Sequence, residues 1–187
     1  MRGSKTSVNQ SAVLLAVALA TMVGLATHAA STPHPTSAVI RTRIFNDCPL
    51  SILTTTDSYP ALIQVSDQNP GSCYGYANLH NWRFSVDDVN PAVFDNDADF
   101  RFGADLVISG TGQGEAGLQV SPWWSQDVDG RLNVRTTDGE IACFGGRLPF
   151  YSFTANHGLH YVKGTSIHLE ATYRPHGLTE SDPATIV

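Results

Sequence analysis

The clearest pattern in this chain is a two-residue alternation of apolar and polar side chains between Phe100 and Ile108. One set is apolar: Phe100, Phe102, Ala104, Leu106 and Ile108. The set between them is mostly polar: Arg101, Gly103, Asp105 and Val107. Because successive side chains of a strand point to opposite faces of a sheet, this segment is predicted to be a half-buried strand.

The same alternation returns in four later segments. Their inward positions are Ala116, Leu118 and Val120, then Leu132 and Val134, then Ile141 and Cys143, and last Ile167, Leu169, Ala171 and Tyr173. Turn signals at 109–114, 127–130 and 138–139 separate the four segments between Phe100 and Cys143. Asp138-Gly139 is a strong hairpin signal, since a tight primed turn needs positive φ, which these two residues tolerate. The segments from Phe100 to Cys143 are therefore predicted to form a four-stranded meander.

Shorter strand candidates precede Phe100, at 39–45, 51–56, 61–65 and around Trp82 and Phe84. No stretch of 12 residues carries a convincing helical stripe. Many short strands with Gly and Asp turns, each with one apolar face, are typical of two antiparallel sheets packed together. The predicted fold is an all-β antiparallel sandwich.

This alternation, with a late strand introduced by Lys163-Gly164, resembles the jelly-roll sandwiches of concanavalin-type lectins and glucanases. The resemblance covers roughly the last 100 residues. It implies a jelly-roll outline and, by analogy, contact with glycans.

The N-terminus has the pattern of a cleavable signal peptide over 1–29. Arg2 and Lys5 precede an apolar run from Ala12 to Ala26, and small residues follow up to Ala29. The alternative is a transmembrane anchor, but a span needs about 20 apolar residues and this run is shorter. The protein is expected to be secreted, periplasmic or extracellular, and the mature chain is not expected to insert into a membrane.

Two further segments complete the predicted organisation. Residues 30–38 are rich in Ser, Thr and Pro and are predicted to be a flexible spacer. Residues 39–187 are predicted to be one sandwich domain, and 184–187 read as a strand that is just beginning. Because an unpaired sheet edge invites association, we expect either a truncated chain or an edge completed by a partner.

Composition argues against a nucleic-acid partner. The formal net charge is −6, with 11 Lys and Arg against 17 Asp and Glu. Two of those basic residues lie in the predicted signal peptide, so the mature chain is more acidic still. Binding to phosphates needs clustered basic residues, which this chain lacks.

Three cysteines remain in the predicted mature chain. Cys48 and Cys73 both lie in turn-rich sequence, where two loops can meet, and an oxidising compartment favours their disulfide. Cys143 lies within a strand pattern and is expected to be a small, buried and free thiol. Pairing of the odd cysteine between chains is the alternative.

No cofactor is predicted. Asp95, Asp97 and Asp99 resemble the start of a calcium loop, but the Gly and Glu that the helix-loop-helix version needs are absent. An irregular calcium site there is the alternative to a solvated acidic loop. His157 and His160 have no companion ligands in a recognised zinc pattern, so no metal site is predicted.

Catalysis, if present, would use carboxylates. Glu115 and Glu170 are the best candidates, because both are predicted to face away from the core and a glycosidase needs two acids roughly 5–10 Å apart. The alternative is that these carboxylates only solvate the sheet.

The binding hypothesis rests on planar polar side chains beside aromatic rings. The predicted ligand-binding residues are Trp123, Trp124, Arg131, Asn133, His168, Glu170 and Arg174. If their strands share a sheet, amides, carboxylates and guanidinium groups can meet sugar hydroxyls while a ring covers the apolar sugar face. The predicted function is a non-catalytic extracellular module that binds a glycan or another surface ligand. The alternative is a secreted glycoside hydrolase.

Overall fold

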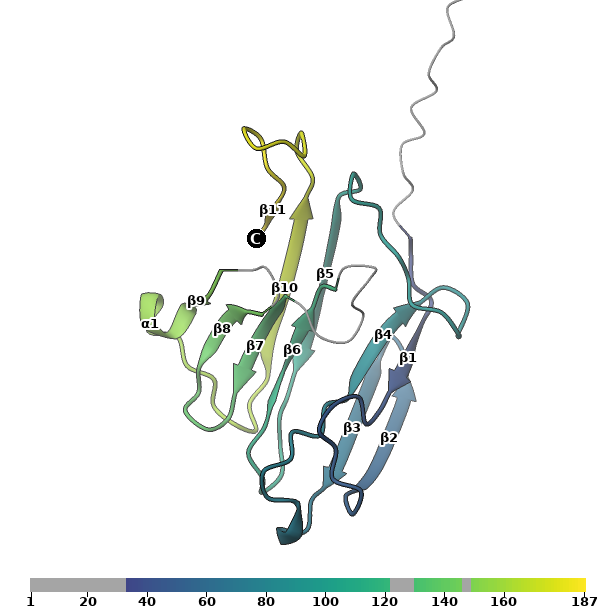
Figure 1. Ribbon diagram of the computed structural model, residues 1–187, viewed down its shortest axis with the longest axis vertical. Helices are drawn as coiled ribbons and strands as arrows, with labels where there is room; N and C mark the ends of the chain where they lie inside the picture. Colours follow the sequence, from purple (N-terminus) through teal and green to yellow (C-terminus); the bar gives the residue numbers. More distant parts are fainter. Residues whose placement is uncertain (1–32, 122–129, 146–148) are drawn as a thin grey trace, which may run out of the picture.

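The computed structural model describes residues 33–121, 130–145 and 149–187, and in them the chain is nearly all β (Figure 1). The strands are β1 (Ser37–Arg41), β2 (Ile52–Ser58), β3 (Leu62–Gln68), β4 (Asn81–Ser85), β5 (Phe100–Leu106), β6 (Glu115–Gln119), β7 (Arg131–Arg135), β8 (Ile141–Phe144), β9 (Tyr151–Ser152), β10 (Ile167–Arg174) and β11 (Thr185–Ile186). One 3-10 turn, η1 (Gly71–Cys73), and one short helix, α1 (Phe153–His157), accompany them. The all-β prediction is confirmed.

The strands form four antiparallel sheets. In strand order these are β1-β4, β2-β3, β11-β10-β5 and β6-β7-β8-β9. The first two sheets lie together on one side of the molecule, as Figure 1 shows, and the larger two make up the rest. We call the larger two the β10 sheet and the β7 sheet.

The predicted four-stranded meander is wrong at its first strand. β6, β7 and β8 are consecutive neighbours, and β9 completes their sheet. β5 instead pairs with β10, with Ala104 opposite Leu169 and Phe102 opposite Ala171. The glycine-rich segment 109–114 therefore connects two different sheets. The alternation correctly predicted which face of β5 is apolar, but alternation carries no information about the partner strand.

The main core lies where the apolar sides of the β7 and β10 sheets meet. Val134, Ile141, Tyr161 and Leu169 are buried there, and the hydroxyl of Tyr161 accepts a hydrogen bond from the backbone of Ile108 at 2.7 Å. Since side chains alternate along each strand, the polar side chains of each sheet point away from this core.

A chain of aromatic rings joins the N-terminal sheets to the β10 sheet. Tyr59 contacts Phe84 with 6.2 Å between ring centroids, and Phe84 contacts Phe102 with 6.1 Å. Phe100 then stacks on Tyr173 at 5.0 Å. These edge-on and offset contacts are the geometries that aromatic rings prefer, so they hold the two parts of the protein together.

Several boundaries differ from the prediction. β1 begins at Ser37, inside the predicted spacer 30–38, and ends at Arg41 rather than near Phe45. Arg43 has a φ of 56°, which a strand cannot accommodate. The helix α1 was not predicted, because five residues are too few to show a helical stripe. The Ser152 side chain caps it by accepting from the backbone N–H of Ala155 at 3.0 Å.

The predicted strand at the end of the chain is present and is paired within this chain. Ile186 lies opposite Tyr173, and the backbone groups of Val187 and Thr172 exchange two hydrogen bonds of 2.8 and 2.9 Å. Residues 185–187 therefore pair with β10 on one side, and β11 is itself the edge strand of that sheet.

Within the described ranges, no helix has the length and apolar character needed to cross a membrane.

Candidate functional site

The outer face of the β7 sheet carries a small polar depression. It is lined by Glu115, Asn133, Arg135, Glu140, Ala142 and Phe144. These residues come from β6, β7, β8 and the turn before β8. The cross-strand register sets Glu115 opposite Arg135 and Asn133 opposite Ala142. The strand pairing itself therefore gathers these groups on one face.

Asn133 forms the floor of this depression. The residue is only 5% exposed, although it lies on the polar face. Its amide donates a hydrogen bond of 2.9 Å to Oε2 of Glu115. Asn133 was predicted to contact a ligand directly. In the structure it is buried, and its amide instead positions the carboxylate of Glu115.

Gly117 permits the close approach of β6 to β7 beside this floor. A Cβ atom at that position would lie 2.0 Å from the carbonyl oxygen of Leu132. Such a distance is far inside van der Waals contact, so only glycine fits without moving one of the strands.

Arg135 forms one wall and is held by two carboxylates. Its Nε and Nη2 atoms donate to the two oxygens of Asp138 at 2.8 and 2.6 Å, and Nη2 also donates to Glu140 at 2.6 Å. This pairing raises the pKa of Arg135 and lowers the pKa of Asp138 to about 2. Arg135 and Asp138 are therefore both charged at neutral pH, and the hydrogen bonds orient the guanidinium.

Arg131 and Phe144 form the other end of the same face. The guanidinium of Arg131 lies 5.6 Å from the ring centroid of Phe144, which is a cation–π distance. Nε of Arg131 is buried and has no hydrogen-bond partner in the part of the chain that the structure describes. The face thus places the Arg131 guanidinium beside the aromatic ring of Phe144.

The outer face of the β10 sheet carries a second group of charges. Glu170 accepts from Arg101 at 2.5 Å, and His168 contacts Asp105 at 2.9 Å. Hydrogen bonding to Asp105 raises the pKa of His168, and hydrogen bonding from Arg101 lowers the pKa of Glu170. Arg174, at the end of the strand, is exposed. These charges mainly satisfy one another across β5 and β10.

The structure separates the two predicted catalytic carboxylates. Glu115 and Glu170 belong to different sheets and point away from the core that lies between them. Moreover, the lowered pKa of Glu170 is opposite to what a general acid requires. The hypothesis that these two acids act as a pair is therefore wrong. The predicted binding residues that the structure describes also divide between two sheets: Arg131 and Asn133 belong to the β7 sheet, and His168, Glu170 and Arg174 belong to the β10 sheet.

Trp123 and Trp124, which were predicted as aromatic platforms, lie outside the described residues.

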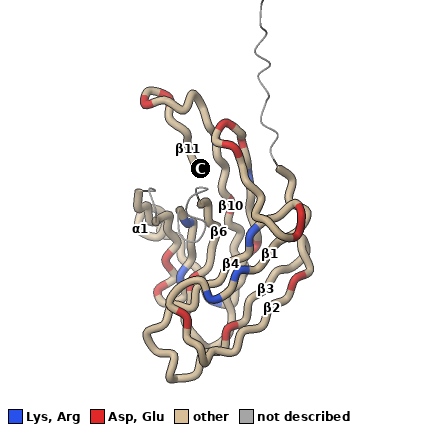
Figure 2. The backbone as a smooth tube through the Cα atoms, turned by 45° about the vertical axis from the view of Figure 1, so that its right-hand side comes forward, with Lys and Arg blue, Asp and Glu red and all other residues tan. Residues whose placement is uncertain are grey.

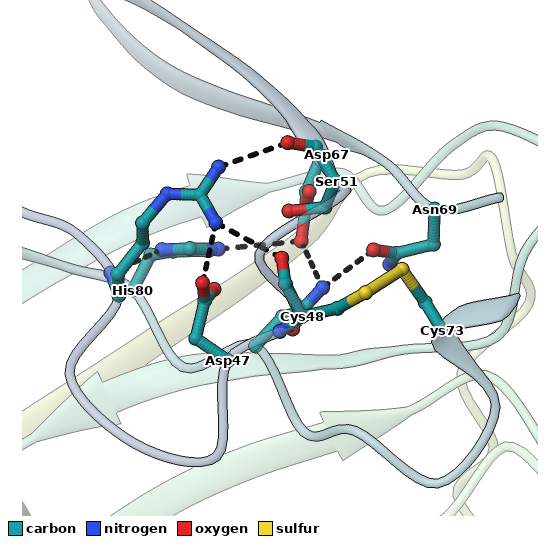
Figure 3. Close-up of polar contacts among 9 residues, drawn as sticks. Asp47, Cys48, Ser51, Asp67, Asn69, Cys73 and His80 are labelled. Atoms are coloured by element: carbon teal, nitrogen blue, oxygen red, sulfur yellow. Dashed lines mark hydrogen bonds and ion pairs between the residues drawn. A yellow bond between two sulfur atoms is a disulfide. The ribbon is translucent and has the colours of Figure 1, made fainter.

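The predicted disulfide between Cys48 and Cys73 is present and lies in a polar network that the sequence pattern did not reveal (Figure 3). Asp67 accepts from Asn78 at 2.7 Å and contacts Nε2 of His80 at 3.3 Å. The Asn78 side chain in turn accepts from the backbone N–H of Cys48 at 2.7 Å. The network links β3, the loop before β4 and the disulfide.

Arg43 extends this network to the loop after β1. It pairs with Asp47 and donates to the carbonyl oxygens of Cys48 and Ser51 at 3.0 and 2.9 Å. The only signal for this arrangement in the sequence is the turn-rich composition around the two cysteines. Because its members are far apart in the chain, the contacts themselves could not be predicted.

Cys143 is free, as predicted, but it is half-buried rather than fully buried. Burial raises the pKa of its thiol.

The acidic loop at Asp95, Asp97 and Asp99 is exposed. Nowhere in the described ranges do three or more His, Cys, Asp or Glu side chains converge as metal ligands would. The structure therefore does not gather these three carboxylates into a calcium site. Figure 2 shows acidic positions on many loops of the molecule and fewer basic ones.

Comparison of this chain with protein-family models, with curated proteins and with solved structures finds no match.

Proposed function

We propose that this protein is a non-catalytic extracellular module that binds a glycan on the outer face of the β7 sheet, around its small polar depression. The observation that carries this proposal is the composition of that depression. Two carboxylates, a fixed guanidinium and a buried amide stand within one small concavity, with Phe144 at its edge. Planar hydrogen-bonding groups suit sugar hydroxyls, and an aromatic ring suits the apolar face of a sugar.

Part of this proposal concerns the fold. We treat the β7 and β10 sheets as the two layers of a β-sandwich with a jelly-roll outline. Support comes from the apolar sides of both sheets, which meet at Val134, Ile141 and Leu169. Such a scaffold holds its outer faces rigid, as a preformed sugar site requires.

The binding test is a glycan array on the mature protein, followed by calorimetry with the best glycan. Glu115→Gln is expected to weaken binding by about tenfold, since it replaces a charge-assisted hydrogen bond with a neutral one. Glu170→Gln is the matched control, because it makes the same change on the β10 sheet. It is expected to leave the affinity unchanged.

Two results would overturn the proposal. One is the absence of binding to any glycan on the array, and the other is an equal loss in both variants. Reducing-sugar release is measured alongside, and none is expected. Release that survives Glu170→Gln but disappears in Glu115→Gln would make the face catalytic.

Export on the signal peptide 1–29 belongs to the same proposal. The apolar run from Ala12 to Ala26 with basic residues before it supports this. Expression of the full chain with mass spectrometry of the exported product is expected to show a new N-terminus at Ala30. Recovery of the uncleaved chain in the cell would contradict export.

A further inference from the structure

One edge of β10 is only partly occupied. On one side β5 pairs with it from Ile167 to Tyr173. On the other side β11 pairs with Tyr173 and Arg174, and Val187 bonds to Thr172. Beyond that point, toward His168, this side of β10 has no strand beside it in the described parts of the chain.

The backbone groups on this open edge can be identified from the register. Thr172 directs both its N–H and its C=O toward Val187. In an antiparallel pair, every second residue bonds to the same side. Glu170 and His168 therefore direct their backbone groups to the open side, where no hydrogen bond from the described residues reaches them. Four unpaired backbone groups in a row are a template for another strand.

An apolar cavity lies beside the same edge. Ala171, Ile186, Cys143 and Leu132 are among the residues that line it, and its exposed surface is almost wholly apolar. Ile186 faces inward, opposite Tyr173, and Val187 faces outward. A strand continuing along this line would next place a side chain opposite Ala171, facing inward into the cavity.

The outward side of the open edge carries one carboxylate, that of Glu170, which also pairs with Arg101 at 2.5 Å. Glu170 is one-third exposed, and the lowered pKa of its side chain keeps it ionised. A residue opposite Glu170 on an added strand would face outward beside it. Opposite charges in that position stabilise a pair of strands, whereas like charges oppose pairing.

We propose that this open edge binds an extended peptide segment of a partner protein, which adds as a strand antiparallel to β10 and in line with β11. The segment carries an apolar residue opposite Ala171, a basic residue opposite Glu170 and an apolar residue opposite Leu169. Main-chain hydrogen bonds supply the affinity and the alternating side chains supply the selectivity.

A second copy of the chain fits this edge less well. The eight residues of its own β10 are more than the open stretch accepts, because Val187 already occupies the place opposite Thr172. The open stretch admits a short, single strand.

The test uses the mature protein and the peptide acetyl-Val-Lys-Val-Thr-Val-Gly-amide, with binding followed by calorimetry. In the proposed register the first Val lies opposite Ala171 and the Lys opposite Glu170. Methylation of the Lys backbone nitrogen removes a hydrogen bond to β10 and is expected to weaken binding by about tenfold. Methylation of the second Val nitrogen is the matched control. That nitrogen points away from β10, so the affinity is expected to stay within about twofold.

A charge exchange tests the outward position. Glu170→Lys is expected to weaken binding of the Lys peptide and to favour the same peptide with Glu in place of Lys. Bound peptide is also expected to slow alkylation of the Cys143 thiol, because that thiol lines the cavity. Glu115→Gln is expected to change none of these results, so failure here is separate from failure of glycan binding.

Absence of binding overturns the proposal, and so does equal weakening by both methylated peptides. A dimer in sedimentation that Glu170→Lys changes and the peptide does not dissociate would assign the edge to a second copy and would also overturn it.

Discussion

Asp67 shows how one side chain can connect loops that are distant in sequence. Its carboxylate meets Asn78 and His80, and only 14% of its side chain is exposed. Burial by itself would raise the pKa of Asp67, but the hydrogen bonds from its neighbours outweigh burial and lower it below 3.8. The charged form is therefore favoured in the folded protein.

Asp67→Asn is expected to lower the free energy of unfolding at pH 7 by about 1–2 kcal/mol, through the loss of charge-assisted hydrogen bonds. Because the folded pKa lies below the unfolded one, this contribution is present above about pH 4 and disappears as the pH falls through the folded pKa. Urea unfolding at pH 7 and at pH 2.5 measures both effects. The difference in the free energy of unfolding between wild type and Asp67→Asn should be smaller at pH 2.5 than at pH 7.

Asp88→Asn is the control. Asp88 is exposed, and Asn adopts its positive φ of 63° as readily as Asp does. A constant difference between wild type and Asp67→Asn across this pH range would contradict the prediction.

At the scale of single residues, the sequence allowed two things to be predicted: the disulfide, and the positions of Glu115 and Arg131 on the polar faces of their strands. The burial of Asn133 could not be predicted, because alternation identifies the face of a strand and not how deeply its neighbours cover that face. The same limit hid the network around Asp67, whose members lie in segments far apart in the chain.

Among the elements, the β6–β7 pair depends on one position. At Gly117 an added methyl group would meet the backbone of Leu132 and Asn133 rather than a flexible side chain. The strands can relieve that contact only by moving apart, which weakens the hydrogen bonds between them.

Gly117→Ala is expected to destabilise the protein by about 1–3 kcal/mol, as overpacking against a rigid neighbour does. Gly112→Ala is the matched control, because nothing lies within 4 Å of its added Cβ and its φ is ordinary. Thermal unfolding followed by circular dichroism compares the two variants. Equal melting temperatures would show that β6 and β7 do not approach as closely as described.

Strand pairing was the part of the fold that the pattern predicted least well. The faces of β5 and β10 were correct, and so was the order β6-β7-β8. The partner of β5 was not, because two amphipathic strands carry the same alternation whether or not they are neighbours. The condition under which Glu115 and Glu170 would share one surface, that their strands lie in one sheet, is not met either, because β6 and β10 belong to different sheets.

For the whole molecule, the Cys48–Cys73 disulfide restrains the N-terminal part. It closes a loop with a sequence separation of 25 and joins the segment before β2 to the 3-10 turn η1 after β3. The aromatic contacts of Phe84 then connect this part to the β10 sheet.

Replacement of both Cys48 and Cys73 by Ala is expected to lower the free energy of unfolding by about 3 kcal/mol, from the loop entropy regained by the unfolded chain. Cys143→Ala is the control and should cost about 1 kcal/mol or less, because it removes one half-buried sulfur atom. Chemical denaturation of both variants measures these changes. A double variant as stable as wild type would mean that the polar network alone suffices.

The pairing of β5 with β10 also determines when the protein can finish folding. Asp105 and His168, which face each other across these strands, are 63 residues apart. A ribosome adding about 5–20 residues per second needs about 3–13 s to cover that interval. During this time β6, β7 and β8 can pair with one another as they emerge, while β5 waits without its neighbour. The β10 sheet can therefore assemble only after the strands of the β7 sheet have been made, and a chaperone that shields β5 in those seconds would act before its partner strand exists.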